Sequence, residues 1–103
     1  MISMGELYHI TNFGNHIAIL RNGLRASADG YIYLLTSKEY AGYIAKNQLG
    51  YTSAYGLLQI NSKGVVKELE ADNVGEIKAS QQKRIKQDLI EARFVSFEGM
   101  YKF

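Results

Sequence analysis

The side chains that could do chemistry lie in three segments that are far apart along the chain. His9 ends a short apolar run, several tyrosines lie between Gly30 and Tyr43, and Glu76 leads a third segment. An imidazole donates or accepts hydrogen bonds, a phenol ring stacks on a flat ligand, and a carboxylate stabilises positive charge. The chain has eight Tyr, which also suit β-strands, so a purely structural use of these rings stays open.

Other well-known site motifs are absent from the sequence. It contains no GxxxxGK[ST] phosphate loop, no GxGxxG, no HExxH and no GxSxG. The two histidines, His9 and His16, have neither cysteine nor clustered carboxylates beside them. We therefore expect no metal site, no Rossmann-type cofactor site and no serine-hydrolase triad.

Composition and length predict one globular domain over residues 1–103. Hydrophobic residues make up 47% of the chain and charged residues 21%, and the net charge is +2. The sequence has no cysteine, no secretory signal and no apolar run of membrane-spanning length. We expect a cytoplasmic protein, in a bacterial or a host-cell cytosol, with no membrane partner and an undetermined oligomeric state.

Hydrophobic patterning predicts an alternation of strands and helices in the first half of the chain. A strand is expected over Leu7–Ile10 and another over Tyr31–Leu35. A helix over Asn12–Asn22 would turn Ile17 and Leu20 inward, before a C-terminal glycine at Gly23. Ser37 is placed to cap a second helix, over Lys38–Asn47, with Tyr40, Tyr43 and Ile44 on one side.

The second half is predicted to consist mostly of strands. The expected elements are strands over Tyr55–Asn61, Val65–Leu69, Val74–Ala79 and Ala92–Phe97, a turn at Ser62–Gly64, and a helix over Gln81–Ile90. This order of elements, with two strands alternating with two helices and then mainly strands, is typical of an α+β domain. We expect a mixed or antiparallel split sheet with two or three short helices.

The order of the three segments resembles the ADP-ribosyltransferase superfamily, in its His-Tyr-Glu branch. The carrying residues are His9-Ile10-Thr11, then Gly30-Tyr31-Ile32-Tyr33-Leu34, then Ser37-Lys38-Glu39-Tyr40-Ala41-Gly42-Tyr43, then Glu76. This branch includes poly(ADP-ribose) polymerases and diphtheria-type toxins. The opening block also resembles toxins that ADP-ribosylate DNA, and RNA 2′-phosphotransferases. Ile10 stands where the family has glycine, and Tyr40 lies near the place of a nicotinamide-binding serine.

The resemblance implies that NAD is the substrate and assigns its catalytic groups to His9, Tyr33 and Glu76. Glu76 would hydrogen-bond a ribose hydroxyl beside the reacting carbon, and His9 would contact the adenosine ribose. The backbone of Ile10 would pair with the nicotinamide amide, and Tyr33 and Tyr43 would sandwich the ring. Further NAD-binding candidates are Thr11, Ser37 and Tyr40.

The implied activity is mono-ADP-ribosyl transfer to a macromolecule. A toxin-like or phage-type effector would carry out this reaction. Three alternatives stay open: NAD hydrolysis, a non-catalytic module that binds NAD, ADP-ribose or a protein, and RNA 2′-phosphotransfer, which would need several arginines around the pocket. A protein is the expected acceptor. A basic cluster leaves nucleic-acid contact as the second interpretation, although Asp88 and Glu91 dilute it; its members are Lys78, Lys83, Arg84, Lys86 and Arg93.

Overall fold

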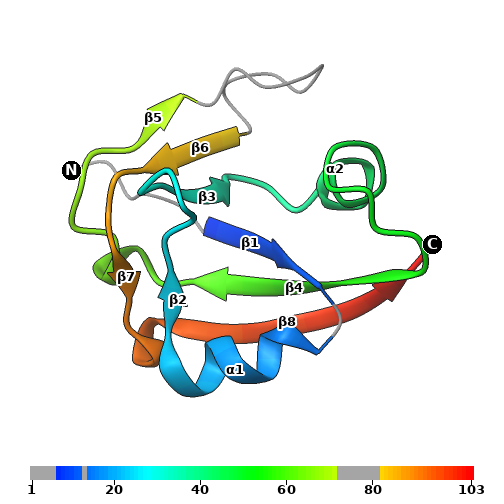
Figure 1. Ribbon diagram of the computed structural model, residues 1–103, viewed down its shortest axis with the longest axis horizontal. Helices are drawn as coiled ribbons and strands as arrows, with labels where there is room; N and C mark the ends of the chain where they lie inside the picture. The colour runs from blue at the N-terminus through cyan, green and yellow to red at the C-terminus, as the bar shows by residue number, and fades with distance from the viewer. Residues whose placement is uncertain (1–6, 13, 72–81) are drawn as a thin grey trace.

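The chain forms an antiparallel sheet with a helix against each face (Figure 1). The computed structural model describes residues 7–12, 14–71 and 82–103. The helices are α1 (Asn15–Asn22) and α2 (Ala41–Asn47), with 3-10 turns η1 (Ser62–Gly64) and η2 (Ala92–Phe94). The strands are β1 (Leu7–Thr11), β2 (Leu24–Arg25), β3 (Ile32–Leu35), β4 (Ala54–Ile60), β5 (Glu70–Ala71), β6 (Gln82–Ile85), β7 (Leu89–Ile90) and β8 (Val95–Lys102).

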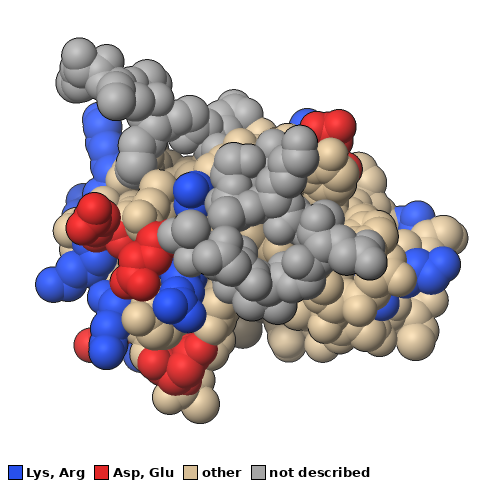
Figure 2. All heavy atoms as spheres, turned by 90° about the horizontal axis from the view of Figure 1, so that it is seen from above, with Lys and Arg blue, Asp and Glu red and all other residues tan. Residues whose placement is uncertain are grey.

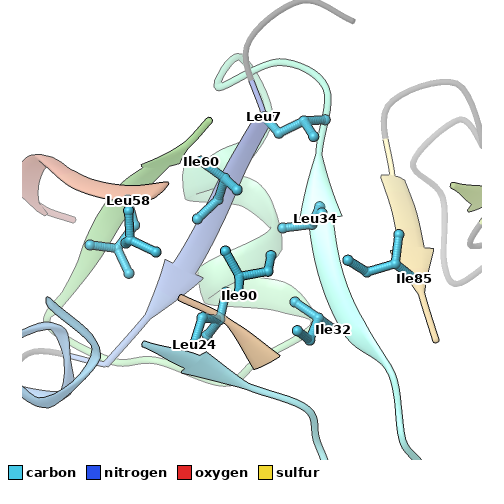
Figure 3. Packing of buried hydrophobic residues seen from close by; sticks show 9 residues of the cluster. Leu7, Leu24, Ile32, Leu34, Leu58, Ile60, Ile85 and Ile90 are labelled. Atoms are coloured by element: carbon cyan, nitrogen blue, oxygen red, sulfur yellow. The ribbon is translucent and has the colours of Figure 1, made fainter. Parts of the chain in front are cut away.

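The main sheet has the strand order β5-β6-β3-β1-β4-β8, and β2 and β7 form a second, two-stranded sheet. One face of the main sheet carries the larger apolar core, drawn in Figure 3. Its fully buried side chains come from the main sheet and from β7, and include Ile32, Leu34, Leu58, Ile85 and Ile90. Ile19 and Leu20 of α1 pack against this core, so α1 and the small sheet cover this face.

The opposite face of the main sheet packs against α2. Ala41, Ile44 and Ala45 are buried on the inner side of this helix. They form the second core with residues of three strands: Tyr8, Ile10, Leu35, Tyr55 and Leu57. Because side chains alternate along a strand, neighbouring residues of β1 and β3 belong to different cores. Leu34 lies in the first core, and Leu35 lies in the second.

The main sheet is split between β1 and β3. β1 pairs with β4 along its whole length, from Leu7↔Ile60 to Thr11↔Gly56, and β3 pairs with β6 from Ile32 to Leu35. Between β1 and β3 the pairing is limited to Tyr8↔Leu35. The second half of β1 therefore faces the first half of β3 without a backbone ladder, which opens the sheet from within.

The predicted fold class is confirmed. The protein is an α+β domain with two α-helices among the described residues, and all the strand pairs described are antiparallel. The strands expected at Leu7–Ile10, Tyr31–Leu35 and Tyr55–Asn61 are present within a residue at each end. In the part of the chain that the structure describes, neither helix is long and apolar enough to cross a bilayer.

Both helices begin later than the sequence predicted. α1 starts at Asn15 after Gly14, which has a φ of 97° and no side chain with which to cap the helix. Ile17, expected to face inward, is 56% exposed, and Ile19 packs on the core beside Leu20. The Ser37 hydroxyl accepts a hydrogen bond from the Glu39 N–H at 3.1 Å, so it stabilises the turn that precedes α2.

The largest error concerns residues 81–90, which were predicted to form a helix. Residues 82–85 form β6 and residues 89–90 form β7. Gln, Lys and Arg favour helices locally, but burial of Ile85 against β3 and of Ile90 in the core outweighs that preference. The strand expected at Val65–Leu69 is also wrong, since only Glu70–Ala71 pairs with β6. The strand expected at Val74–Ala79 lies outside the described residues.

Gln87 anchors the segment between β6 and β7. Its amide nitrogen donates to the carbonyls of Gly64 and Leu89, each at 2.8 Å, and its oxygen accepts from the Val66 N–H at 2.9 Å. The residue is 9% exposed. The Gln87 side chain therefore satisfies three backbone groups, those of Gly64, Val66 and Leu89, and connects the segment at the end of η1 to the start of β7.

We expect Gln87→Leu to lower the free energy of unfolding by about 2–4 kcal/mol. The change leaves three backbone groups without their partner, and each buried group left unpaired costs on the order of 1–3 kcal/mol. Urea unfolding followed by circular dichroism measures this loss. Gln59→Leu is the matched control, and an equal loss in both variants would contradict a special role for Gln87.

Candidate functional site

A pocket of about 460 Å³ opens where the main sheet is split. β1 contributes His9, Ile10 and Thr11 to its wall, and β3 contributes Tyr33 and Leu35 among others. The volume lies within the usual range of small-molecule sites. The unpaired stretch between β1 and β3 is therefore a place where a ligand could meet both strands.

The rest of the wall comes from α2 and from segments beside it. Ile44 lies on the inner side of α2, and Gln48, Leu49 and Tyr51 follow it along the chain. Burial raises the pKa of the Tyr51 phenol further above neutral pH. Apolar walls with a few polar groups are typical of pockets that hold a flat organic ring.

The pocket draws on both faces of the sheet. Ile10 and Leu35 belong to the core under α2, whereas Leu34 belongs to the core on the other face. Strand alternation puts His9 on the same face as Leu7, away from Ile10. A continuous ladder would separate these two sets of side chains, and the split between β1 and β3 lets both line one cavity.

His9 is fixed across the split by a hydrogen bond. Its Nδ1 lies 2.8 Å from the carbonyl oxygen of Tyr33. Since a carbonyl only accepts, Nδ1 must carry the proton. Burial lowers the pKa of His9, although the bond to Tyr33 opposes that shift in part. The ring is therefore neutral at pH 7, and its Nε2 is a hydrogen-bond acceptor.

Tyr33 is held at both its backbone and its side chain. Its carbonyl accepts from His9, and its hydroxyl donates to Asp29 Oδ2. Asp29 also accepts from the Tyr31 N–H at 2.9 Å through its other oxygen. The bond from Tyr33, followed by the one from Tyr31, lowers the pKa of Asp29. The loop before β3 thus fixes the position of the Tyr33 ring at the pocket.

The structure brings some of the predicted site residues together. His9, Ile10, Thr11 and Tyr33 all line the pocket. The remaining NAD-binding candidates, Ser37, Tyr40 and Tyr43, do not line it. Tyr40 packs half-buried against the second core, and Tyr43 is 41% exposed on α2. The predicted catalytic carboxylate, Glu76, lies outside the described residues.

Sequence reasoning missed several residues of the pocket. Gln48, Tyr51 and Gln82 line it, as does Ser27. Gln82 was assigned to a helix, so its position on β6, opposite Leu35, could not be anticipated. Asp29 is a turn residue by composition, and nothing in the sequence links its carboxylate to the Tyr33 hydroxyl.

The basic cluster is largely engaged by neighbouring side chains. Arg84 lies 4.3 Å from the centre of the Tyr31 ring and 3.6 Å from a Glu70 oxygen, and Arg93 pairs with Glu91 at 2.6 Å. Lys78 lies outside the described residues. On the face drawn in Figure 2, acidic side chains lie among the basic ones. Within the described ranges, no three His, Asp or Glu side chains are grouped to hold a metal ion.

The lowered pKa of the half-buried His9 predicts that lowering the pH destabilises the fold. Because the folded pKa of His9 lies below the unfolded value of about 6.5, the unfolded chain binds the proton more readily than the folded chain as the pH falls. The free energy of unfolding should therefore decrease from pH 7.5 to 5.5. One proton sets a slope of at most about 1.4 kcal/mol per pH unit. Urea unfolding at several pH values measures this slope.

His9→Asn and His16→Gln separate the contributions of the two histidines. The amide introduced by His9→Asn can still donate to the Tyr33 carbonyl but does not titrate, so the slope between pH 7.5 and 5.5 should flatten. His16→Gln should keep it. A slope unchanged by His9→Asn would show that His9 titrates alike in the folded and unfolded chains.

The fold of this chain is similar to that of a protein of known structure. No protein-family model and no curated protein matches the chain. The structure of protein CC0527 from Caulobacter crescentus superimposes with a TM-score of 0.59 at 17% sequence identity. The match covers 94% of this chain and 84% of that protein. At this identity the likeness concerns the fold alone, and it shows that the same arrangement of elements occurs in a second protein.

Proposed function

We propose that the pocket between β1 and β3 binds NAD and that the protein breaks its nicotinamide–ribose bond. The observation that carries this proposal is the pairing of His9 with the Tyr33 carbonyl at the wall of one cavity. These are the two residues, distant in sequence, to which the resemblance assigns the ribose and the nicotinamide ring. The proposal therefore rests on two things: the resemblance, and the position of His9 and Tyr33 at the same pocket.

The chemistry requires a site that favours charge redistribution in the substrate. When the bond breaks, its electron pair moves to the nicotinamide nitrogen, which loses its positive charge. The ribose carbon becomes oxocarbenium-like, and an acceptor then bonds to it and releases a proton. Positioning of the ring and negative charge near the sugar lower the barrier. The resemblance assigns that negative charge to Glu76.

His9 and Tyr33 have complementary roles in this proposal. With its proton fixed on Nδ1, His9 offers Nε2 to a ribose hydroxyl, and its neutral state avoids repulsion of the positively charged nicotinamide. The Tyr33 ring offers an aromatic face to that cation. The bond from its hydroxyl to Asp29 orients the ring before a ligand arrives.

ADP-ribose would be transferred once, to a macromolecule, and a protein is the acceptor we favour. The role we favour is that of a toxin-like or phage-type effector, acting in a bacterial or host-cell cytosol. NAD hydrolysis uses the same bond cleavage with water as the acceptor. A module that binds NAD without cleaving it is the main alternative, and the experiment below distinguishes these three outcomes.

We expect the purified protein to release nicotinamide from NAD. The assay uses NAD labelled on the adenylate phosphate, with and without cell extract, and measures nicotinamide by chromatography. Label on a macromolecule indicates transfer, and free ADP-ribose indicates hydrolysis. Unchanged NAD, together with measurable binding by calorimetry, would leave a binding module. Unchanged NAD without binding would contradict the proposal.

Single substitutions separate binding from turnover in the same assay. Glu76→Gln should keep NAD binding and slow nicotinamide release by about 100-fold or more, as expected for loss of one electrostatic group. His9→Asn should weaken NAD binding because it lacks the Nε2 acceptor. His16→Gln is the matched control and should behave as wild type. Full activity of Glu76→Gln would show that the carboxylate assignment is wrong.

The ring of Tyr33 should contribute more to the affinity for NAD than its hydroxyl does. Tyr33→Phe keeps the aromatic face, whereas Tyr33→Leu removes about 1 kcal/mol of stacking, or roughly fivefold in affinity for NAD. Calorimetric titration with NAD measures both variants, and Tyr101→Leu on β8 is the control for loss of a phenol elsewhere. Equal affinities for Tyr33→Leu and wild type would exclude stacking on this ring.

A further inference from the structure

Two glutamine side chains meet at the wall of the pocket, where β6 begins and α2 ends. The Gln82 Nε2 donates to Gln48 Oε1 at 3.2 Å, and both residues line the pocket. Gln82 is only 7% exposed. Its Oε1 and the Nε2 of Gln48 are buried, and neither has a hydrogen-bond partner among the described residues. One acceptor and one donor are thus left over at the same wall.

This surplus does not depend on how the two amides are oriented. If both amides were turned over, Gln48 would donate to Gln82, and the leftover groups would be the Gln48 oxygen and the Gln82 nitrogen. A single hydrogen bond between two primary amides always leaves one whole NH2 group and one whole carbonyl oxygen without a partner. A buried polar group without a partner costs free energy, so the pair is suited to a ligand that supplies both.

Gln87 shows what a glutamine with a purely structural role looks like in this protein. It is similarly buried, but its amide is satisfied by three backbone partners, and it does not line the pocket. Gln82 has one partner among the described residues, which is itself a pocket residue. The difference between the two glutamines points to a ligand as the missing partner of the Gln48–Gln82 pair.

We propose that the Gln48–Gln82 pair recognises the uncharged amide edge of a flat ligand. This edge is either a carboxamide attached to a ring or a lactam within a ring. Such an edge presents a donor next to an acceptor and so complements the donor and acceptor left over on the pair. Choosing the nicotinamide carboxamide as the first ligand rests on the proposed function. The terminal torsion of glutamine is soft, so the two amides can turn toward a ligand at little cost.

The pair should discriminate strongly against a carboxylate in the same place. Nicotinic acid has nearly the shape of nicotinamide but offers only acceptors. Its oxygens would face the leftover carbonyl, and its charge would be buried among apolar walls such as Leu35 and Ile44. We expect nicotinic acid to bind roughly tenfold more weakly than nicotinamide, or worse, because a buried acceptor stays unpaired.

Nuclear magnetic resonance on the nitrogen-15-labelled protein tests this proposal. Nicotinamide, nicotinic acid and hypoxanthine are each titrated while the side-chain amide signals are followed. We expect nicotinamide or hypoxanthine to shift the signals of Gln48 and Gln82 and to leave those of Gln87 unchanged. No shift with either ligand, or equal affinity for nicotinamide and nicotinic acid, would overturn the proposal.

Variants add a second, independent measurement. Gln82→Leu should reduce the preference for nicotinamide over nicotinic acid by about tenfold, and Gln59→Leu should not. If Gln82→Leu fails to fold, Gln48→Leu supplies the same comparison from the end of α2. Binding of hypoxanthine alone would support the amide pair and count against NAD as substrate. Cleavage of NAD that is indifferent to both variants would support the proposed function and overturn the role of the pair.

Discussion

The split between β1 and β3 is the constraint on which the site depends. Each strand is fully paired on its outer side, with β4 or with β6, but the two meet only at Tyr8↔Leu35. The Tyr33 carbonyl therefore needs a partner that no ladder supplies, and the His9 imidazole provides it at 2.8 Å. One side chain thus satisfies the backbone at the split and is itself fixed in a single neutral tautomer.

The surrounding elements maintain this arrangement from both sides of the sheet. The small β2–β7 sheet and α1 bury one face, and α2 buries the other. Since each core holds alternate residues of β1 and β3, a slip of either strand by one residue would move its side chains from each core to the opposite face. The cavity is therefore bounded by well-packed strands. Its wall is mainly apolar, and its polar side chains are those of His9, Thr11, Ser27, Tyr33, Gln48, Tyr51 and Gln82.

The sequence was informative wherever local pattern and burial agreed. The strands around His9 and Tyr33 are short apolar runs bounded by turn residues, and the resemblance places both residues at one site. It failed at residues 82–90, where helix-forming Gln, Lys and Arg are held in strands by Ile85 and Ile90. That failure also concealed Gln82 as a pocket residue. Tyr43 matched the motif by spacing, but it lies on the exposed side of α2 and outside the pocket.

The chemistry of the pocket favours a ligand that is flat, carries hydroxyl groups and presents an amide edge. An imidazole acceptor, an oriented phenol ring and a spare amide donor and acceptor all lie at its wall. Apolar side chains from β3 and α2, among them Leu35 and Ile44, line the same wall. The nicotinamide riboside half of NAD has each of the complementary features, which is why we propose it as the ligand in preference to a simple nucleobase.

A crystal structure of the protein with a non-cleavable carbocyclic analogue of NAD tests the central claim most directly. We expect the nicotinamide ring against Tyr33 inside the split of the sheet, with a ribose hydroxyl within hydrogen-bonding distance of His9 Nε2. An analogue bound elsewhere on the surface, with the space between β1 and β3 unchanged and empty, would contradict it.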